Sequence, residues 1–191
     1  MRYNHKTDDP RVLGMKLARK LGPLPWNVIC IGTDRSTGDA LGPLTGSFLQ
    51  NSTLPGIFVD GDIDDPIHAA NLGEFSSTFV PHGPVLAIDA CLGKKDNVGT
   101  VTLCEEPLRP GAGVKKDLPQ IGDSHIAGIV NVGGLMEYYV LQNTRLSIVM
   151  SMSHWIAKAV QAGSFLASPE ITQCESAASS SSKRSNSMKY H

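Results

Sequence analysis

The stretch "VICIGTDRSTGDALGP", residues 28–43, decides the fold of this chain. It begins with an apolar, β-branched run at 28–32 that suits a strand buried on both faces. A glycine-rich turn follows. Pro43 then stands in the first turn of a helix whose apolar residues recur at helical spacing. This order of strand, turn and helix is typical of α/β proteins.

Similar units recur along the rest of the chain. The sequence predicts further strands at 57–61, 84–90, 99–105 and 145–152, helices at 8–20, 65–79, 134–143 and 153–167, and a long loop at 106–124. Because strands alternate with helices, we expect an α/β fold, a three-layer α/β/α sandwich around a mostly parallel sheet. In such sheets the functional residues gather where strands end and helices begin.

The composition limits the partners and the compartment. The 191 residues carry 17 basic and 18 acidic side chains, and this balance argues against a nucleic-acid partner. No apolar run is long enough to span a membrane, and the amino-terminal residues lack the apolar core of a signal peptide. The four cysteines form no CxxC pair and suggest free thiols. We therefore expect a cytoplasmic protein without a membrane partner.

The length predicts a single domain over residues 1–167. From residue 168 to 191 the composition becomes rich in serine and poor in apolar residues. This change predicts a disordered tail.

The glycine-rich turn does not suit phosphate. A phosphate-binding loop has the pattern GxxxxGK followed by Ser or Thr, whereas Gly32 and Gly38 are one residue too far apart and Asp39 replaces the lysine. A bound anion would also meet Asp34. A simple structural interpretation is that Asp39 caps the helix that follows.

A second carboxylate favours a chemical interpretation. In "VLAIDACLG", residues 85–93, Asp89 follows four apolar residues at the expected carboxyl end of a buried strand. Burying a carboxylate without a partner is costly. Asp39 and Asp89 would converge on one crevice, where neighbouring carboxyl groups push their pKa values apart, so that one acts as acid and the other as base. Alternatively, the two carboxylates share a metal ion.

Several blocks of the chain resemble the YyaC family of sporulation proteins, a smaller relative of the spore germination protease. They are "IGTDRSTGDALGPLTG", "PIHAANL", "AIDACLG", "VGT", "PGAGVKKDLP" and "GIVNVGGLMEYYVLQNTRL". Both families are similar in fold to the hydrogenase maturation endopeptidases, which implies a phosphorylase/hydrolase-like sandwich.

The resemblance also implies an activity. In the germination protease a "DALGP" block and an "IDAL" block supply the catalytic aspartates, and they match Asp39 and Asp89 here. The implied protein is an aspartate-dependent endopeptidase of the forespore or spore interior. It needs no cofactor, and its protein substrates would be small acid-soluble spore proteins. The germination protease is a longer chain with an autoprocessed amino-terminal segment, and we expect no such segment in this protein.

The hydrogenase maturation proteases suggest a metal-dependent alternative. They bind nickel through an acid in the turn, an aspartate after a later strand and a histidine. Asp39, Asp89 and His125 would be the corresponding set, although "GDSHIAG" around His125 resembles the metal-binding block weakly.

Other side chains are candidates for the edge of the crevice. We expect His68, Asn71 and Asp34 to contact substrate, with a structural hydrogen bond as the alternative for His68. Cys91 is a candidate thiol nucleophile, but a neighbouring carboxylate disfavours its thiolate, so a packing role is the better interpretation.

Two further alternatives stay open. The chain could be a non-catalytic spore protein that binds a protein partner. It could also form a homo-oligomer, because the apolar segment "LMEYYVL", residues 135–141, suits an interface as well as a core.

Overall fold

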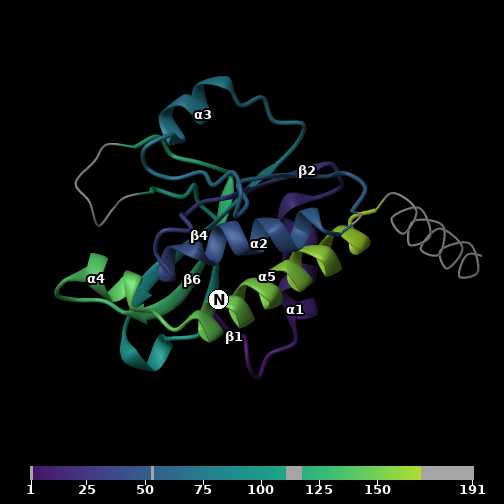
Figure 1. Ribbon diagram of the computed structural model, residues 1–191. Coiled ribbons are helices and arrows are strands. Elements are labelled where there is room, and N and C mark those ends of the chain that lie inside the picture. Colours follow the sequence, from purple (N-terminus) through teal and green to yellow (C-terminus); the bar gives the residue numbers. More distant parts are fainter. Residues whose placement is uncertain (1, 53, 111–117, 169–191) are drawn as a thin grey trace, which may run out of the picture.

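The computed structural model describes residues 2–52, 54–110 and 118–168, which form one mixed sheet surrounded by helices (Figure 1). The strands are β1 (Arg2–Asn4), β2 (Trp26–Cys30), β3 (Ile57–Asp60), β4 (Val85–Gly93), β5 (Thr100–Cys104) and β6 (Ser124–Val132). The α-helices are α1 (Pro10–Leu21), α2 (Leu41–Gln50), α3 (Leu72–Thr78), α4 (Glu137–Gln142) and α5 (Leu146–Leu166), and the short 3-10 helices are η1 (Gly38–Ala40) and η2 (Lys95–Asn97). Apart from Ser168, the tail predicted at 168–191 lies outside the described residues.

The strands of the sheet follow the order β1-β5-β6-β4-β2-β3. The central strand β4 pairs in parallel with β2 and β6, and β2 pairs in parallel with β3. At the other edge β5 is antiparallel to β6, and β1 is antiparallel to β5. The mostly parallel sheet is thus confirmed, with an antiparallel edge that includes two strands, β1 and β6, that were not predicted.

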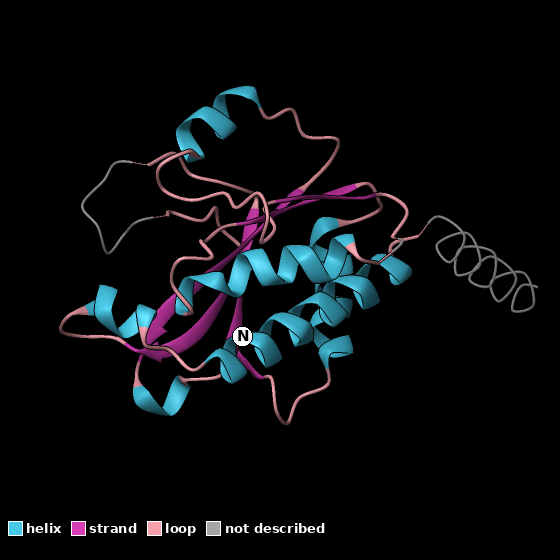
Figure 2. Ribbon diagram, viewed as in Figure 1, coloured by secondary structure: helices cyan, strands magenta, loops and turns pink. Residues whose placement is uncertain are grey.

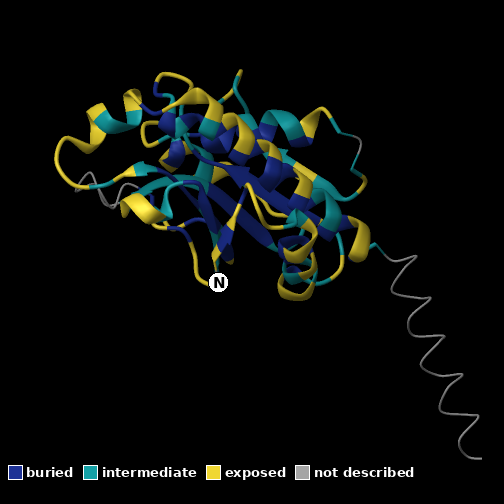
Figure 3. Cartoon of the chain, turned by 90° about the horizontal axis from the view of Figure 1, so that it is seen from below, coloured by how far each residue is buried: buried dark blue, intermediate teal, exposed yellow. Residues whose placement is uncertain are grey.

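Helices and loops cover the two faces of the sheet in separate layers (Figure 2). Successive side chains of a strand point to opposite faces, so Val28 and Ile29 belong to different clusters. The larger cluster lies between the sheet and α1, α2 and α5, and the smaller one includes Leu72 of α3. Figure 3 shows the strands as the buried centre of the molecule. The three-layer α/β/α architecture is therefore confirmed.

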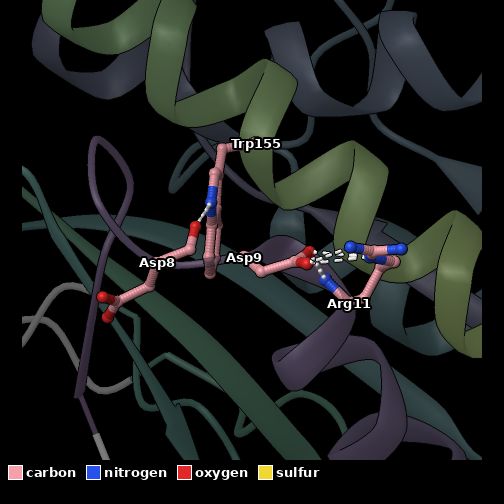
Figure 4. A network of polar contacts seen from close by, with 4 residues as sticks. All are labelled: Asp8, Asp9, Arg11 and Trp155. Carbon is pink, nitrogen blue, oxygen red and sulfur yellow. Dashed lines mark hydrogen bonds and ion pairs between the residues drawn. The ribbon is translucent and has the colours of Figure 1, made fainter.

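Helices α1 and α5 pack closely and bring the two ends of the described chain together. A side chain at Gly163 would meet the Gly14 carbonyl oxygen at 2.8 Å, so glycine permits this close contact. Trp155 of α5 donates from Nε1 to the Asp8 carbonyl oxygen at 2.8 Å, just before α1 begins (Figure 4). The next residue, Asp9, caps α1 by accepting from the backbone N–H of Arg11.

The strand predicted at 145–152 is wrong, because this segment is the first part of α5. The β-branched pair Ile148 and Val149 suggested a strand. In the structure, Val149, Met152 and Ile156 are buried at a helical spacing of three and four residues, and this packing outweighs local strand propensity.

One other predicted boundary is also wrong. The helix expected at 65–79 begins only at Leu72, because Ile67 instead forms a parallel β-bridge with Ile31. In the described part of the predicted loop at 106–124, neither a helix nor a strand forms before β6 begins at Ser124.

None of the helices in the described part of the chain is long and apolar enough to cross a membrane.

Candidate active site

The candidate site lies where β2 ends and β4 continues. The pairing of these strands ends at Cys30 and Ile88, and the Ile31 N–H donates to the Ile88 carbonyl oxygen at 2.8 Å. Asp89 is the next residue of β4, and burial along the strand falls from complete to partial at this point. Asp89 therefore lies within β4 rather than at its end, but at the point where the neighbouring strand stops.

The glycine-rich turn folds back on itself to place Asp39 against β4. Gly32 has a φ of 151° and donates its N–H to the Ile67 carbonyl oxygen at 2.8 Å. A Cβ atom on Gly32 would collide with the Asp39 carbonyl oxygen, which accepts a hydrogen bond from the Thr33 N–H at 3.2 Å. The turn therefore requires glycine for its own closure.

Asp39 does not cap α2. The residue at the N-cap position is Ala40, and no side-chain hydrogen bond caps this helix. Asp39 instead lies in η1, which packs against β4, and its side chain is partly buried. Burial raises the pKa of the Asp39 carboxyl group, and the Ser36 hydroxyl lowers it by a smaller amount. The capping interpretation is thus wrong.

Asp89 is the more strongly perturbed of the two acids. Burial raises its pKa to about 7, the N–H of Ala90 lowers it, and the negative charge of Asp39 raises it further. The Ala90 N–H donates to Asp89 Oδ1 at 2.8 Å. The charge of Asp39 thus acts on Asp89, as expected for two neighbouring carboxyl groups. Such a pair can hold one proton near neutral pH and combine an acid with a base.

The candidate substrate contacts have structural partners. The Asn71 side chain accepts from the His68 N–H at 2.8 Å and donates to the Pro66 carbonyl oxygen at 3.0 Å. His68 Nδ1 accepts from the Ala70 N–H at 3.3 Å, which gives His68 a structural hydrogen bond, although its partner is an N–H rather than a backbone carbonyl. Both side chains shape the segment that carries Ile67, the hydrogen-bond partner of Gly32. Asp34 is exposed and accepts from the Thr33 hydroxyl. Substrate contact by Asp34, His68 and Asn71 stays a prediction.

The structure does not bring His125 to the carboxyl pair. His125 lies in β6 rather than in a loop, opposite Ala87, and its Nδ1 bonds the Glu106 carbonyl oxygen at 2.8 Å. Within the described ranges, no three His, Cys, Asp or Glu side chains are grouped as they would be around a metal ion.

Cys91 does not favour the thiolate form. Burial raises its pKa to about 11, and the charge of Asp89 adds to this effect. The thiol is therefore protonated at neutral pH, as a packing role requires.

Ser36 was not among the residues predicted for the site. Its side chain is only 4% exposed, and Oγ forms no hydrogen bond of standard geometry with the described residues. It nevertheless lies close enough to Asp39 to lower the pKa of that carboxyl group. The sequence could have indicated Ser36, because it lies three residues before Asp39 in the glycine-rich turn.

The fold and the two interacting carboxyl groups define the class of protein, an α/β sandwich with a candidate acid–base site beside the end of a parallel strand. The chain belongs to the family described as "Protein of unknown function (DUF1256)", whose model matches residues 13–159. This match includes both Asp39 and Asp89.

The chain is also similar to individual proteins. The chain is 51% identical over 143 residues to "Uncharacterized protein YyaC" of Bacillus subtilis (strain 168), which covers 73% of this chain and 70% of that protein. This match confirms the resemblance to the YyaC family. A crystal structure of a NiFe hydrogenase maturation protease, HycI from Thermococcus kodakarensis KOD1, matches 78% of this chain and 98% of its own, with a TM-score of 0.49 and 15% identity.

Proposed function

We propose that this protein is an endopeptidase in which Asp39 is the general base and Asp89 the general acid. One observation carries this proposal: two partly buried carboxyl groups, 50 positions apart in the chain, interact electrostatically, and the pKa of Asp89 rises to about 7. A general acid must be protonated near the working pH, and a base must be ionised. Ser36 lowers the pKa of Asp39 only, which assigns the base role to Asp39.

The reaction needs one water molecule. The Asp39 carboxylate takes a proton from water as the water oxygen bonds to the peptide carbonyl carbon. The Asp89 carboxyl group protonates the carbonyl oxygen. The tetrahedral intermediate then collapses: the C–N bond breaks as Asp39 passes its proton to the leaving nitrogen. One hydroxyl of the intermediate returns its proton to Asp89 as the C=O bond forms again, which restores both carboxyl groups. The buried Ser36 hydroxyl favours the ionised form of Asp39, as a base requires.

The substrate is a polypeptide. The two motif blocks that contain Asp39 and Asp89 match the catalytic blocks of the spore germination protease, so small acid-soluble spore proteins are the substrate class. The protein would therefore act in the spore interior.

The test is a cleavage assay on small acid-soluble spore proteins. We expect the wild-type chain to cleave them in the presence of a chelator, and Asp39→Asn and Asp89→Asn to lose at least about 100-fold in rate, the usual contribution of acid–base catalysis. Asp64→Asn is the matched control, because Asp64 is an exposed aspartate outside the site.

Each other outcome has a definite meaning. Full activity in both site variants would refute the carboxyl-pair mechanism. Activity that disappears with the chelator would instead favour the metal-dependent alternative, with Asp39 and Asp89 as ligands. No cleavage by the wild-type chain would refute the peptidase assignment for this substrate class.

A further inference from the structure

A group of apolar side chains projects into solvent beside the candidate site. Leu135, Met136, Tyr138 and Tyr139 are 92%, 73%, 72% and 58% exposed. We call these four residues the apolar ridge. The sequence left open whether residues 135–141 serve a core or an interface. Because the ridge is exposed, core packing does not explain these four residues, and grouped exposed apolar side chains mark interaction sites.

The segment that carries the ridge contacts η1, which holds Asp39, and β4, which holds Asp89. A Cβ atom on Gly38 would lie 2.8 Å from the Leu141 side chain and 3.0 Å from Thr144 Oγ1, so α4 and the residues after it pack directly on η1. At the other side, the Gly133 N–H donates to the Gly93 carbonyl oxygen of β4 at 2.8 Å. Figure 1 shows α4 at the end of the sheet where β4 and β6 end. The segment that carries the ridge therefore packs against η1, which holds Asp39, and is hydrogen-bonded to β4, which holds Asp89.

The charge of this segment excludes several kinds of ligand. Glu137 is its single charged residue between positions 133 and 144, and its carboxylate accepts from the Gly134 N–H at 3.2 Å. An uncharged apolar surface with one acid does not suit nucleic acid or a phosphate group. Its aromatic and aliphatic side chains suit apolar side chains of another polypeptide.

The backbone of the ridge is unusual as well. Met136 is a non-glycine residue with a φ of 54° and a ψ of 43°, in the left-handed region. This conformation is unfavourable for methionine, and packing of the side chain does not offset its cost, because the side chain is exposed. The strained turn thus holds an apolar side chain in solvent.

We propose that the apolar ridge binds exposed apolar side chains of an unfolded polypeptide and so positions its backbone at Asp39 and Asp89. This inference rests on the proposed function and names its substrate class. Folded proteins bury their large apolar side chains, whereas an unfolded chain exposes them close to the peptide bonds that are to be cleaved. Unfolded polypeptide is thus the occupant that matches both the ridge and the adjoining site.

The experiment measures binding separately from cleavage. Binding of fluorescently labelled, reduced and carboxymethylated α-lactalbumin, a permanently unfolded protein, is measured by anisotropy with the full-length Asp89→Asn chain. Adding Leu135→Ser and Tyr138→Ser should weaken binding by at least about tenfold, as for aromatic interface residues. Val80→Ser is the matched control, because Val80 is equally apolar, 77% exposed and located before β4. Circular dichroism verifies folding of each variant.

Unchanged binding in the ridge variant, or an equal loss in Val80→Ser, would overturn the proposal. It would also be overturned by sedimentation that shows a dimer dependent on the ridge while binding of the unfolded probe is unaffected, because the occupant would then be a second copy. Failure of the proposed function is distinguishable, since probe binding through the ridge without cleavage by the wild-type chain refutes hydrolysis alone.

Discussion

At the residue scale, Asp89 couples the stability of the protein to pH. Its pKa is about 7 in the folded protein, whereas the ordinary aspartate value is 3.8. The folded state therefore binds more protons than the unfolded state between these two values, and the free energy of unfolding falls as pH rises through this window. Above pH 7, folding must hold a poorly solvated charge at this position.

Replacement of Asp89 by asparagine removes that charge. We expect Asp89→Asn to raise the free energy of unfolding at pH 8 by on the order of 1–2 kcal/mol, since part of the full effect is lost to solvent screening. The gain should shrink below pH 7 and vanish near pH 4. Urea titrations at pH 8 and pH 4.5 measure it. A destabilised Asp89→Asn variant at pH 8 would contradict the cause assigned to the pKa shift.

The same group predicts the pH dependence of catalysis. If Asp89 is the general acid, kcat/KM should fall about tenfold per pH unit above about pH 7, where Asp89 loses its proton. Because the two carboxyl groups interact, the limits of the profile belong to the pair. Initial rates on small acid-soluble spore proteins from pH 4 to 9 measure the profile. Constant rates from pH 6 to 9 would exclude Asp89 as the acid.

At the element scale, the close contact between α1 and α5 depends on two glycines, Gly14 and Gly163, which have no side chain. A Cβ atom on Gly163 would lie 2.8 Å from the Gly14 carbonyl oxygen and 3.3 Å from Trp26. Local propensity favours alanine over glycine inside a helix. The packing contact opposes it, because a backbone carbonyl cannot move aside without shifting the whole helix.

Two glycine variants separate propensity from packing. We expect Gly163→Ala to lower the free energy of unfolding by about 1–3 kcal/mol, the usual cost of overpacking. Gly73→Ala in α3 should raise it by roughly 0.5–1 kcal/mol, because a Cβ atom at Gly73 would meet no other atom within 4 Å. Thermal and urea unfolding measure both variants. Equal effects would show that helix propensity alone decides.

At the scale of the whole molecule, the first and last elements of the described chain pack into the same core. The edge strand β1 pairs with β5, and α5 packs against α1. The ring of Trp155 lies 6.1 Å from that of Tyr3, and its indole N–H bonds Asp8. Since both ends contribute to one core, the single domain predicted over 1–167 should unfold cooperatively.

This cooperativity has a direct test. The sequence contains two tryptophans, Trp26 and Trp155, and both are buried in the larger core. We expect tryptophan fluorescence and far-ultraviolet circular dichroism to report the same midpoint in urea. Two separate transitions would contradict the assignment of a single domain.

Local sequence signals predicted the central part of the fold. The strands predicted at 28–32, 57–61 and 84–90 are short apolar runs ended by glycine or a polar residue, and they located β2, β3 and the first part of β4. The glycine-rich turn was also recognisable, because its shape depends on the backbone conformation at Gly32. The two blocks that contain Asp39 and Asp89 indicated the candidate site, because each block is a contiguous stretch that can be recognised in the sequence.

Elements that depend on distant partners were not predictable in this way. Strand β6 lies after a loop rich in proline and glycine, and its position is defined by pairing with β4 and β5. The first part of α5 has strand-like residues, and it is helical as part of a long helix that packs on α1 and α2.

The sequence by itself thus determined the α/β class, the parallel centre of the sheet and the two acidic positions, since each depends on local pattern. Only the tertiary structure decided that Asp39 is not a cap, that His125 lies apart from the pair and that the apolar ridge is exposed. The physical reason is that burial, electrostatic interaction and exposure depend on which segments meet in space, and local sequence does not contain that information.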